Sequence, residues 1–424
     1  MGFQQGLSGL NASSKNLDVI GHNIANSGTV GFKASRTEFA AMVANAIGTA
    51  GSGNAGIGVQ VGAVAQQFTQ GNISVTGNNL DVAINGNGFF RIQQPDGSTA
   101  YTRAGNFKLD DKGNVVTNNH GKVMGYPMDP VTRTRTASTP QPLSFPTGVP
   151  IPAEQTKNIT TSFNLDARVA TMSINDRANY GTSINVYDSQ GVATAVSLYF
   201  QKDATANTWS VYDSLTSTTA IGTIAFDGTG KLKTITQIGP IPTPAPVPPP
   251  TSSQLVLSVN PSPANPNSPP APTGTPGPFP VKLDLSQVTQ FGTKFAVSEL
   301  TQDGYTAGQL TGINIGNDGT IMASYSNGVT RAEGQVALAS FRNTQGLADI
   351  GNNLWQETFE SGQPVMGVPT EGAFGALRSG ALEDSNVDLT AELVNMMTAQ
   401  RAYQANAQTI KTQDQVLSTL VNLR

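Results

Sequence analysis

Residues 389–424 read LTAELVNMMTAQRAYQANAQTIKTQDQVLSTLVNLR, and no glycine or proline interrupts them. Along this stretch one face recurs at alternating spacings of four and three residues, the heptad pattern of helices that supercoil. The positions of this seam are Leu389, Leu393, Met396, Gln400, Tyr403, Ala407, Ile410, Asp414, Leu417 and Val421. Asp388 is placed to cap the first turn, and Glu392 adds negative charge near the helix start. The pattern predicts one helix about 50 Å long, at a rise of 1.5 Å per residue.

The N-terminal residues carry a shorter seam of the same kind. Its positions are Phe3, Leu7, Leu10, Ser14, Leu17, Gly21 and Ile24. Two helices at opposite ends of a chain, each with one apolar stripe, can bury those stripes against each other as a coiled coil. A helical hairpin inside an ordinary globular fold is the alternative. Because both seams include small or polar positions, an isolated pair would be weak, and we expect further packing from other copies of the chain.

The residues between the two helices follow a β pattern. Residues 80–126 predict short strands separated by turn signals such as Asn85-Gly86 and Pro95-Asp96-Gly97. A further hairpin is predicted at 313–325, and a separate β-rich block spans about 159–238. Residues 240–280 contain most of the prolines, which favour extended, exposed backbone. We interpret them as a surface loop that includes one short strand at Leu255-Val256-Leu257.

The sequence therefore predicts a mainly β, multidomain protein with nested domain insertion and long terminal α-helices that pair as a coiled coil. Residues 1–30 and 383–424 form the helical domain. Residues 31–70 are expected to be an extended or irregular connector, because glycines crowd 48–62. Residues 71–150 and 288–382 form a first β domain. Residues 151–287 form an inserted outer β domain that carries the proline-rich loop at 240–280.

Composition argues against several classes of partner. Charged residues make up 12% of the chain, about half the usual share. A β-rich protein with many turns would explain this, and so would a surface that packs against copies of itself, where unpaired charge is costly. The net charge is −4 without a run of Lys or Arg, so we expect neither nucleic acid nor an anionic membrane as partner. We also expect no cleaved signal peptide and no membrane insertion.

The sequence offers little for catalysis or metal binding. It contains no Cys and two His, His22 and His120. Neither an HExxH nor a G-x-S-x-G motif occurs. The glycine-rich turn at 85–88 lacks the following Lys-Ser/Thr of a phosphate loop, and Asp110 to Asn114 lacks the carboxylate spacing of an EF-hand. We therefore predict that the chain is not an enzyme and holds no cofactor and no metal.

Both ends of the chain resemble those of the flagellar rod and hook axial proteins. At the N-terminus, residues 17–26 and the residues that follow match the family signature. At the C-terminus, residues 385–390 and 399–410 match its counterpart, and residues 81–84, 88–90 and 101–107 look like the family's β core. The signature residues are Asn23, Ile24, Ala25, Asn26, Thr29, Gly31, Phe32 and Lys33.

The resemblance implies a structural subunit that polymerises into the curved tubular hook, a universal joint that transmits motor torque. The inserted β block and the ending Thr419 to Arg424 favour this over the distal rod. The implied partners are other copies of the chain, the distal rod, the hook cap, the hook–filament junction proteins and the flagellar export apparatus. The implied location is extracellular, after export without a cleaved signal peptide.

The assembly contacts implied by the resemblance lie on the helix seams. They are Phe3, Leu7, Leu10, Leu17, Ile24, Leu389, Leu393, Met396, Tyr403, Ala407, Ile410, Leu417 and Val421. Two alternatives stay open. A distal rod protein would form a straight, rigid filament. A secreted β-rich adhesin or hydrolase would be a monomer with a formed pocket, but it would leave the two heptad seams unexplained.

Overall fold

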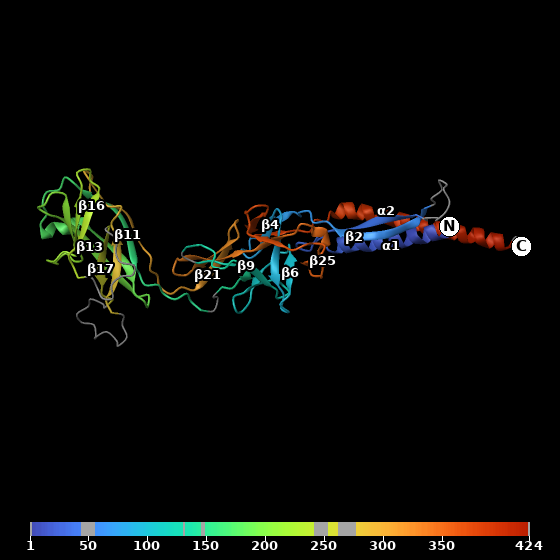
Figure 1. Cartoon of the computed structure of the whole chain (residues 1–424), viewed down its shortest axis with the longest axis horizontal. Helices are drawn as coiled ribbons and strands as arrows, with labels where there is room; N and C mark the ends of the chain where they lie inside the picture. The colour runs from blue at the N-terminus through green and yellow to red at the C-terminus, as the bar shows by residue number, and fades with distance from the viewer. Residues whose placement is uncertain are drawn as a thin grey trace. The chain divides into compact units, whose positions relative to one another are not determined.

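The computed structural model describes residues 2–43, 56–129, 132–145, 149–240, 253–261 and 277–422. They form two compact units (Figure 1). The first unit contains residues 1–148, 311–324 and 330–424, and the second contains 149–310 and 325–329. The second unit is thus inserted into the first. The predictions of a mainly β, multidomain fold and of nested insertion are confirmed.

The first unit begins and ends with a helix, α1 (Gly2–Ala25) and α2 (Leu389–Asn422). The two helices are antiparallel neighbours, because Gly6 approaches Ile410 while Asn23 bonds to Glu392. The predicted pairing of the terminal helices is confirmed. Asp388 caps α2 as expected, since its Oδ1 accepts hydrogen bonds from the amides of Thr390 and Ala391.

A β-hairpin packs beside α1. It consists of β1 (Ser35–Val43) and β2 (Gly56–Gln66), which pair antiparallel, and the tip at 44–55 lies outside the described residues. This hairpin occupies much of the segment expected to be an extended or irregular connector. One glycine of this hairpin is required by its position. Gly58 has φ +134° and lies against α1, where an added Cβ would collide with Ser8.

The β core of the first unit is built around one sheet whose strands differ in length. Within the described residues its main path runs β21-β22-β23-β9-β5-β6-β26-β25, with short strands attached at the sides. Its strands are β5 (Phe89–Gln93), β6 (Thr99–Thr102), β7 (Lys108–Leu109), β8 (Val115–Val116), β9 (Lys122–Pro127), β10 (Gln141–Pro142), β21 (Leu310–Ile315), β22 (Thr320–Tyr325), β23 (Thr330–Val336), β24 (Leu338–Ser340), β25 (Ala348–Asp349), β26 (Leu354–Gln356) and β27 (Val365–Gly367).

Two short strand pairs link this sheet to the helices. β4 (Val82–Asn85) pairs with β28 (Ala376–Ser379), and β3 (Ile73–Val75) pairs with β29 (Ala381–Glu383). Both pairs join residues about 300 apart in sequence, so they connect the segments of the first unit that precede and follow the inserted unit along the chain. Residues 383–388, which were assigned to the helical domain, are therefore strand and linker, and the helix itself begins at Leu389 as expected.

The second unit contains two sheets. One has the order β17-β18-β11-β19 with β20 beside β11, and the other has the order β12-β13-β14-β15-β16. The strands are β11 (Asn158–Asp166), β12 (Gly181–Tyr187), β13 (Ala193–Lys202), β14 (Thr208–Tyr212), β15 (Gly222–Phe226), β16 (Leu232–Gln237), β17 (Gln254–Val259), β18 (Phe279–Asp284), β19 (Thr289–Phe291) and β20 (Ala296–Gln302). A 3₁₀ turn spans Ile174–Tyr180 in the second unit, and another spans Thr344–Gly346 in the first.

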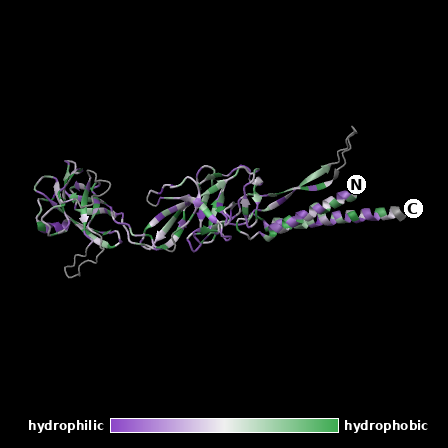
Figure 2. Cartoon of the chain, turned by 60° about the horizontal axis from the view of Figure 1, so that its bottom comes forward, coloured by the Kyte–Doolittle hydropathy of each residue, from purple (hydrophilic) through white to green (hydrophobic). Residues whose placement is uncertain are grey.

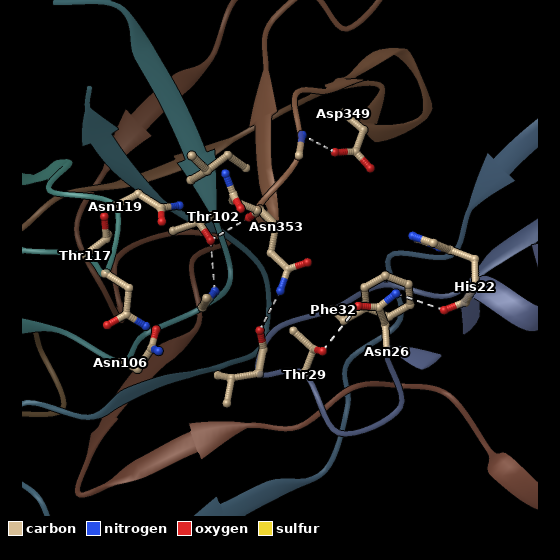
Figure 3. Close-up of a pocket in the computed structure, with 16 residues that line it drawn as sticks. His22, Asn26, Thr29, Phe32, Thr102, Asn106, Thr117, Asn119, Asp349 and Asn353 are labelled. Atoms are coloured by element: carbon tan, nitrogen blue, oxygen red, sulfur yellow. Dashed lines mark hydrogen bonds between the residues drawn. The ribbon is translucent and has the colours of Figure 1, made fainter. Parts of the chain in front are cut away.

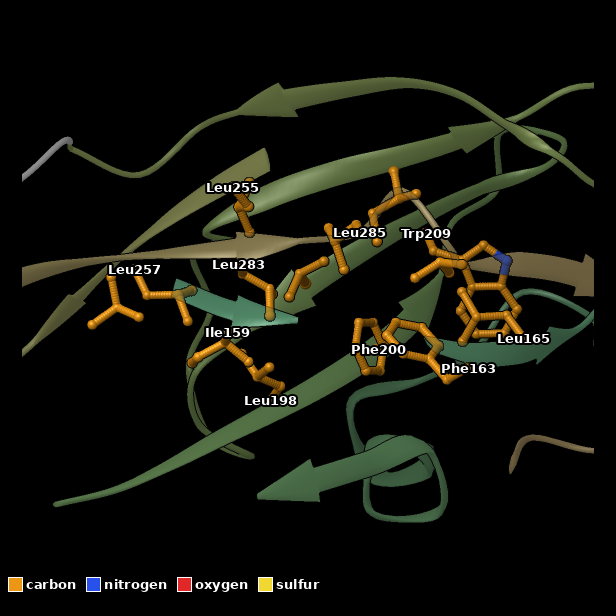
Figure 4. Close-up of a cluster of buried hydrophobic side chains, with 14 of the residues drawn as sticks. Ile159, Phe163, Leu165, Leu198, Phe200, Trp209, Leu255, Leu257, Leu283 and Leu285 are labelled. Carbon is orange, nitrogen blue, oxygen red and sulfur yellow. The ribbon is translucent and has the colours of Figure 1, made fainter. Parts of the chain in front are cut away.

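The limits of the second unit differ from those expected at 151–287. β19 and β20 both pair with β11, so residues 288–310 belong to the inserted unit. Of the proline-rich region, residues 241–252 and 262–276 lie outside the described residues. The strand expected at Leu255-Val256-Leu257 is present as β17. It belongs to the core, because the side chains of Leu255 and Leu257 are buried (Figure 4).

Each unit has its own aromatic core and its own buried tryptophan. In the second unit Trp209 is fully buried near Phe163 and Phe200, whose ring centroids lie 4.6 Å apart (Figure 4). In the first unit Trp355 is buried, and the ring centroids of Trp355 and Phe89 lie 5.7 Å apart. The chain contains 2 Trp, so each unit carries one fluorescent reporter.

We predict that Trp209→Ala destabilises the second unit by about 3–5 kcal/mol, the usual result of truncating a buried tryptophan. The fluorescence of Trp355 should still report an unchanged unfolding midpoint for the first unit. The reciprocal variant Trp355→Ala is the control. If Trp209→Ala lowers the midpoint of the Trp355 transition, or Trp355→Ala lowers the midpoint of the Trp209 transition, the two units do not have independent cores.

Candidate functional site

Asn23 joins three elements at the base of the terminal helices. Its side chain is almost fully buried at 1% exposure. Its amide Nδ2 donates to the carbonyl of Ser35 at 2.8 Å, and its Oδ1 accepts from the amide of Ser35 at 2.9 Å. Nδ2 also lies 3.2 Å from Glu392 Oε1. One side chain therefore fixes α1 to the start of β1 and to the first turn of α2.

The signature residues that follow Asn23 form a tight turn against the β core. Thr29 donates a hydrogen bond to the Asn26 side chain, and Asn26 donates to the carbonyl of His22. Gly31 has φ +69°, and an added Cβ would lie 2.5 Å from the amide nitrogen of Ala104. Its own amide donates to the carbonyl of Glu383 at 2.8 Å. Only glycine fits this conformation at this distance from neighbouring backbone.

A buried carboxylate, Glu383, lies beneath this turn. Its Oε1 accepts from Lys33 Nζ at 2.6 Å, and its Oε2 accepts from Arg103 at 3.1 Å. Lys33 and Glu383 side chains are 0% exposed, and Arg103 is 5% exposed. Oε1 also accepts from the backbone amide of Gly71. The carboxylate thus links residue 33 after α1, the segment after β2 and the β core.

The three charges depend on one another. Burial lowers the pKa of Lys33 below its ordinary value, and the Glu383 carboxylate opposes that shift. Burial likewise lowers the pKa of Arg103, again opposed by Glu383. Without the carboxylate, two cations would be left buried beside each other, and breaking such a pair typically costs about 3–5 kcal/mol.

Asn386 completes the junction from the side of α2. Its Oδ1 accepts from the amide of Ala34 at 2.7 Å, and its Nδ2 donates to the carbonyl of Gln67 at 2.7 Å. Sequence reasoning included Asn386 and Arg103 in the family matches without a role, and it did not identify Glu383. No local pattern marked Glu383, because its partners Lys33 and Arg103 are distant in sequence.

Small residues of α1 lie directly against α2. An added Cβ on Gly6 would lie 3.0 Å from Ile410 Cγ1, and one on Gly9 would lie 2.8 Å from the Asn406 side chain. Ala12 on α1 and Ala399 on α2 are buried. Small residues allow the two helix axes to approach closely. The face of α1 that carries them is offset around the helix from the predicted heptad positions.

The expected seam residues consequently fall into three groups. Those at least about a third exposed are Phe3 47%, Leu7 44%, Leu389 46%, Leu393 47%, Tyr403 37% and Leu417 55%. Those partly buried are Leu10, Leu17, Ile24, Met396, Ala407 and Ile410. The Val421 side chain lies outside the described residues.

A polar cleft of about 440 Å³ lies beside the signature turn (Figure 3). Thr29, Phe32, Thr102, Asn106 and Asn353 are among the side chains that line it. Figure 3 labels two titratable groups, Asp349 and His22, and both have partners within the chain. Both carboxylate oxygens of Asp349 accept hydrogen bonds, from Gly351 and Gln66, and the His22 ring packs 5.4 Å from Phe32.

Within the described part of the chain, no cluster of three or more His, Cys, Asp or Glu side chains is arranged to hold a metal ion. Neither of the described helices is both long and apolar enough to cross a membrane.

Known families match the chain in four consecutive parts. The matching models are a flagella basal body rod protein over residues 3–33, the flagellar hook protein FlgE/F/G D1 domain over 83–176, the flagellar basal body protein FlaE D2 domain over 158–305 and the flagellar basal body rod FlgEFG protein C-terminal region over 378–423. The first match covers nearly all of α1 and the residues that follow it, and the last match covers α2 and the residues that precede it.

Relatives that match over their full length show which family the chain belongs to. The flagellar hook protein FlgE of Escherichia coli is 40% identical over 100% of both chains, and that of Salmonella typhimurium is 39% identical over 100% of both. The chain belongs to the flagellar hook protein FlgE family. The crystal structure of Helicobacter pylori flagellar hook protein FlgE2 covers 73% of this chain with a TM-score of 0.51 and 16% sequence identity, which supports the FlgE fold alone.

We predict that Gly6→Leu separates α1 from α2, because the new side chain must displace Ile410. Hydrogen exchange of the α2 amides between residues 400 and 410 should become faster, while exchange in the β core stays unchanged. Gly21→Leu is the matched control, since nothing lies within 4 Å of an added Cβ there. Equal exchange in both variants would contradict the small-residue interface.

Proposed function

We propose that this FlgE-family chain is the structural subunit of a curved tubular flagellar hook, and that its terminal helices form the contacts between copies. The observation that carries the proposal is the position of the apolar side chains. The two helices already approach each other closely at Gly6 and Gly9, yet large apolar residues remain exposed on both. A helix pair that only stabilised a monomer would bury its largest side chains first.

The exposed residues lie in the first two turns of α1 and along most of α2. On α1 they are Phe3 and Leu7, and on α2 they are Leu389, Leu393, Val394, Met397, Tyr403, Val416 and Leu417. Figure 2 shows hydrophobic and hydrophilic residues interspersed along both helices. Apolar surface of this extent is typical of interaction sites. The described residues give it no cover, so we assign it to neighbouring copies of the chain.

The C-terminal end of α2 extends past the N-terminal end of α1. Since Gly6 lies opposite Ile410, the antiparallel course leaves α2 without an α1 neighbour a few residues beyond that point. Leu417 lies in this last part of α2 and is 55% exposed. We infer that in the polymer this part packs on helices of adjacent copies.

The wider proposal follows from the family. Export through the flagellar apparatus without a cleaved signal would deliver the chain outside the cell. There it would assemble under the hook cap, between the distal rod and the hook–filament junction proteins. The hook would then transmit torque as a universal joint. The distal rod protein is the second candidate, and a straight, rigid polymer would favour it.

A non-enzymatic role fits the chemistry of the cleft beside the signature turn. Its lining consists mainly of Asn and Thr side chains, and Asp349 is already held by two hydrogen bonds. An adhesin or hydrolase would leave the exposed apolar residues of the helices unexplained.

We predict that Leu417→Asp prevents polymerisation without changing the unfolding midpoint of the monomer. The side chain is exposed in the single chain, so the monomer tolerates the charge. In the polymer the same charge would be buried and unpaired, at a cost of about several kcal/mol per subunit. Polymer mass by sedimentation and the melting temperature by circular dichroism provide the two readouts.

Ser418→Asp is the matched control, because it adds the same charge at the adjacent exposed polar position. It should polymerise. If both variants polymerise like the wild type, the last turns of α2 are not an assembly contact. If both fail equally, added charge anywhere in these turns is sufficient and the apolar stripe is not the cause.

A further inference from the structure

Phe359 is the most exposed large apolar side chain among the described residues. It is 102% exposed, and the next values are 70% for Val149 and 68% for Val75. The aromatic ring therefore makes essentially no contact with its own chain. Single exposed apolar residues are common on protein surfaces, so exposure alone does not indicate a function. The construction of the turn that carries Phe359 gives the second observation.

The turn at residues 358–361 is held from both sides of Phe359. The amide of Thr358 donates to the Ser361 hydroxyl at 2.9 Å, and that hydroxyl donates back to the Thr358 carbonyl at 2.9 Å. The Thr358 hydroxyl accepts from the amides of Glu360 and Ser361. Ser361 is 1% exposed. Phe359 therefore projects from a turn whose two flanking positions are fixed by reciprocal hydrogen bonds.

The base of the turn is fixed to the rest of the first unit. The Thr358 hydroxyl donates to the carbonyl of Gly346, and the Asn343 amide donates to the carbonyl of Glu360. Gly346 lies so close that an added Cβ would be 2.4 Å from the Ser361 nitrogen. Before Phe359, Glu357 accepts a hydrogen bond from the buried Tyr101 hydroxyl at 2.9 Å. A side chain presented in this way loses little conformational freedom when it binds.

The segment after the turn adds apolar surface and a strand. Val365 is 63% exposed and begins β27, which pairs only with β24 among the described strands. The other edge of β27 is therefore not paired with a described strand. Interface centres are typically enriched in aromatic side chains that insert into a partner's hollow. Residues 357–365 provide such an aromatic anchor and a second apolar contact.

We propose that Phe359 is an anchor that inserts into an apolar hollow on a second copy of this chain. A polymer of identical subunits that grows without closing requires heterologous contacts, in which an anchor on one face meets a different face of the next copy. Phe359 has the form of such an anchor. The carboxylates of Glu357 and Glu360 flank it, so the receiving hollow carries no acidic rim. This inference rests on the proposed function, because it requires that copies of the chain assemble.

The experiment replaces Phe359 with the photo-reactive analogue benzoylphenylalanine and irradiates assembled polymer and dilute monomer separately. We expect covalent dimers from polymer and none from monomer, with the cross-linked peptide outside residues 343–367. The same analogue at Val75 is the control for random proximity in the polymer. Cross-linking at 359 that is no stronger than at 75 would overturn the proposal.

A substitution gives the energetic test. Phe359→Ser should raise the critical concentration for polymerisation by about tenfold or more, the usual effect of truncating an aromatic anchor. Phe359→Leu should recover most of the affinity, and Val75→Ser should have no effect. If wild-type protein polymerises and Phe359→Ser does so at the same concentration, only this inference fails. If wild-type protein does not polymerise at all, the proposed function fails with it.

Discussion

The structure of the first unit depends on one buried carboxylate. Glu383 is 0% exposed and binds Lys33 from the segment after α1, Arg103 from the β core and the amide of Gly71 after β2. Its backbone carbonyl also receives the amide of Gly31. Buried charges are stable only when they are paired and hydrogen-bonded, so these partners hold one another in place. Segments separated by up to 350 residues are thereby joined beneath the helix pair.

This junction separates two tasks along the chain. The helices α1 and α2 approach each other closely at Gly6 and Gly9, and several large apolar side chains of both helices are exposed. The β core and the inserted unit each fold around their own aromatic centre. Because Asn23 and Glu383 connect helices to strands through several short bonds, a force applied to the helices would reach the β core through defined contacts. A hook subunit that transmits torque requires such a connection.

The sequence predicted the features that depend on local patterns. The long helix after Asp388, the strand at Leu255 and the hairpin at 313–325 follow from periodicity, capping and turn residues. The hairpin β1–β2 was missed because its glycines suggested irregular backbone, whereas Gly58 provides close contact with α1. The limit at residue 287 was misplaced because β19 and β20 pair with β11, more than 120 residues earlier. The close contact between the helices lies beside the predicted seam. The heptad pattern favours large side chains at the interface, whereas in the structure Gly6 and Gly9 lie against α2. Glu383 could not be found because its partners, Lys33 and Arg103, are distant in sequence.

The most direct test of this account is hydrogen exchange in the variant Glu383→Gln, which retains the shape of the side chain and removes its charge. The account predicts that the amides of Gly31 and Ala34 exchange faster than in the wild type by more than about tenfold, as expected when a buried ion pair is broken. Glu371→Gln is the control, because Glu371 pairs with Arg135 at the surface with 66% of its side chain exposed. Exchange at Gly31 and Ala34 that is equal in the two variants would contradict the central role of Glu383.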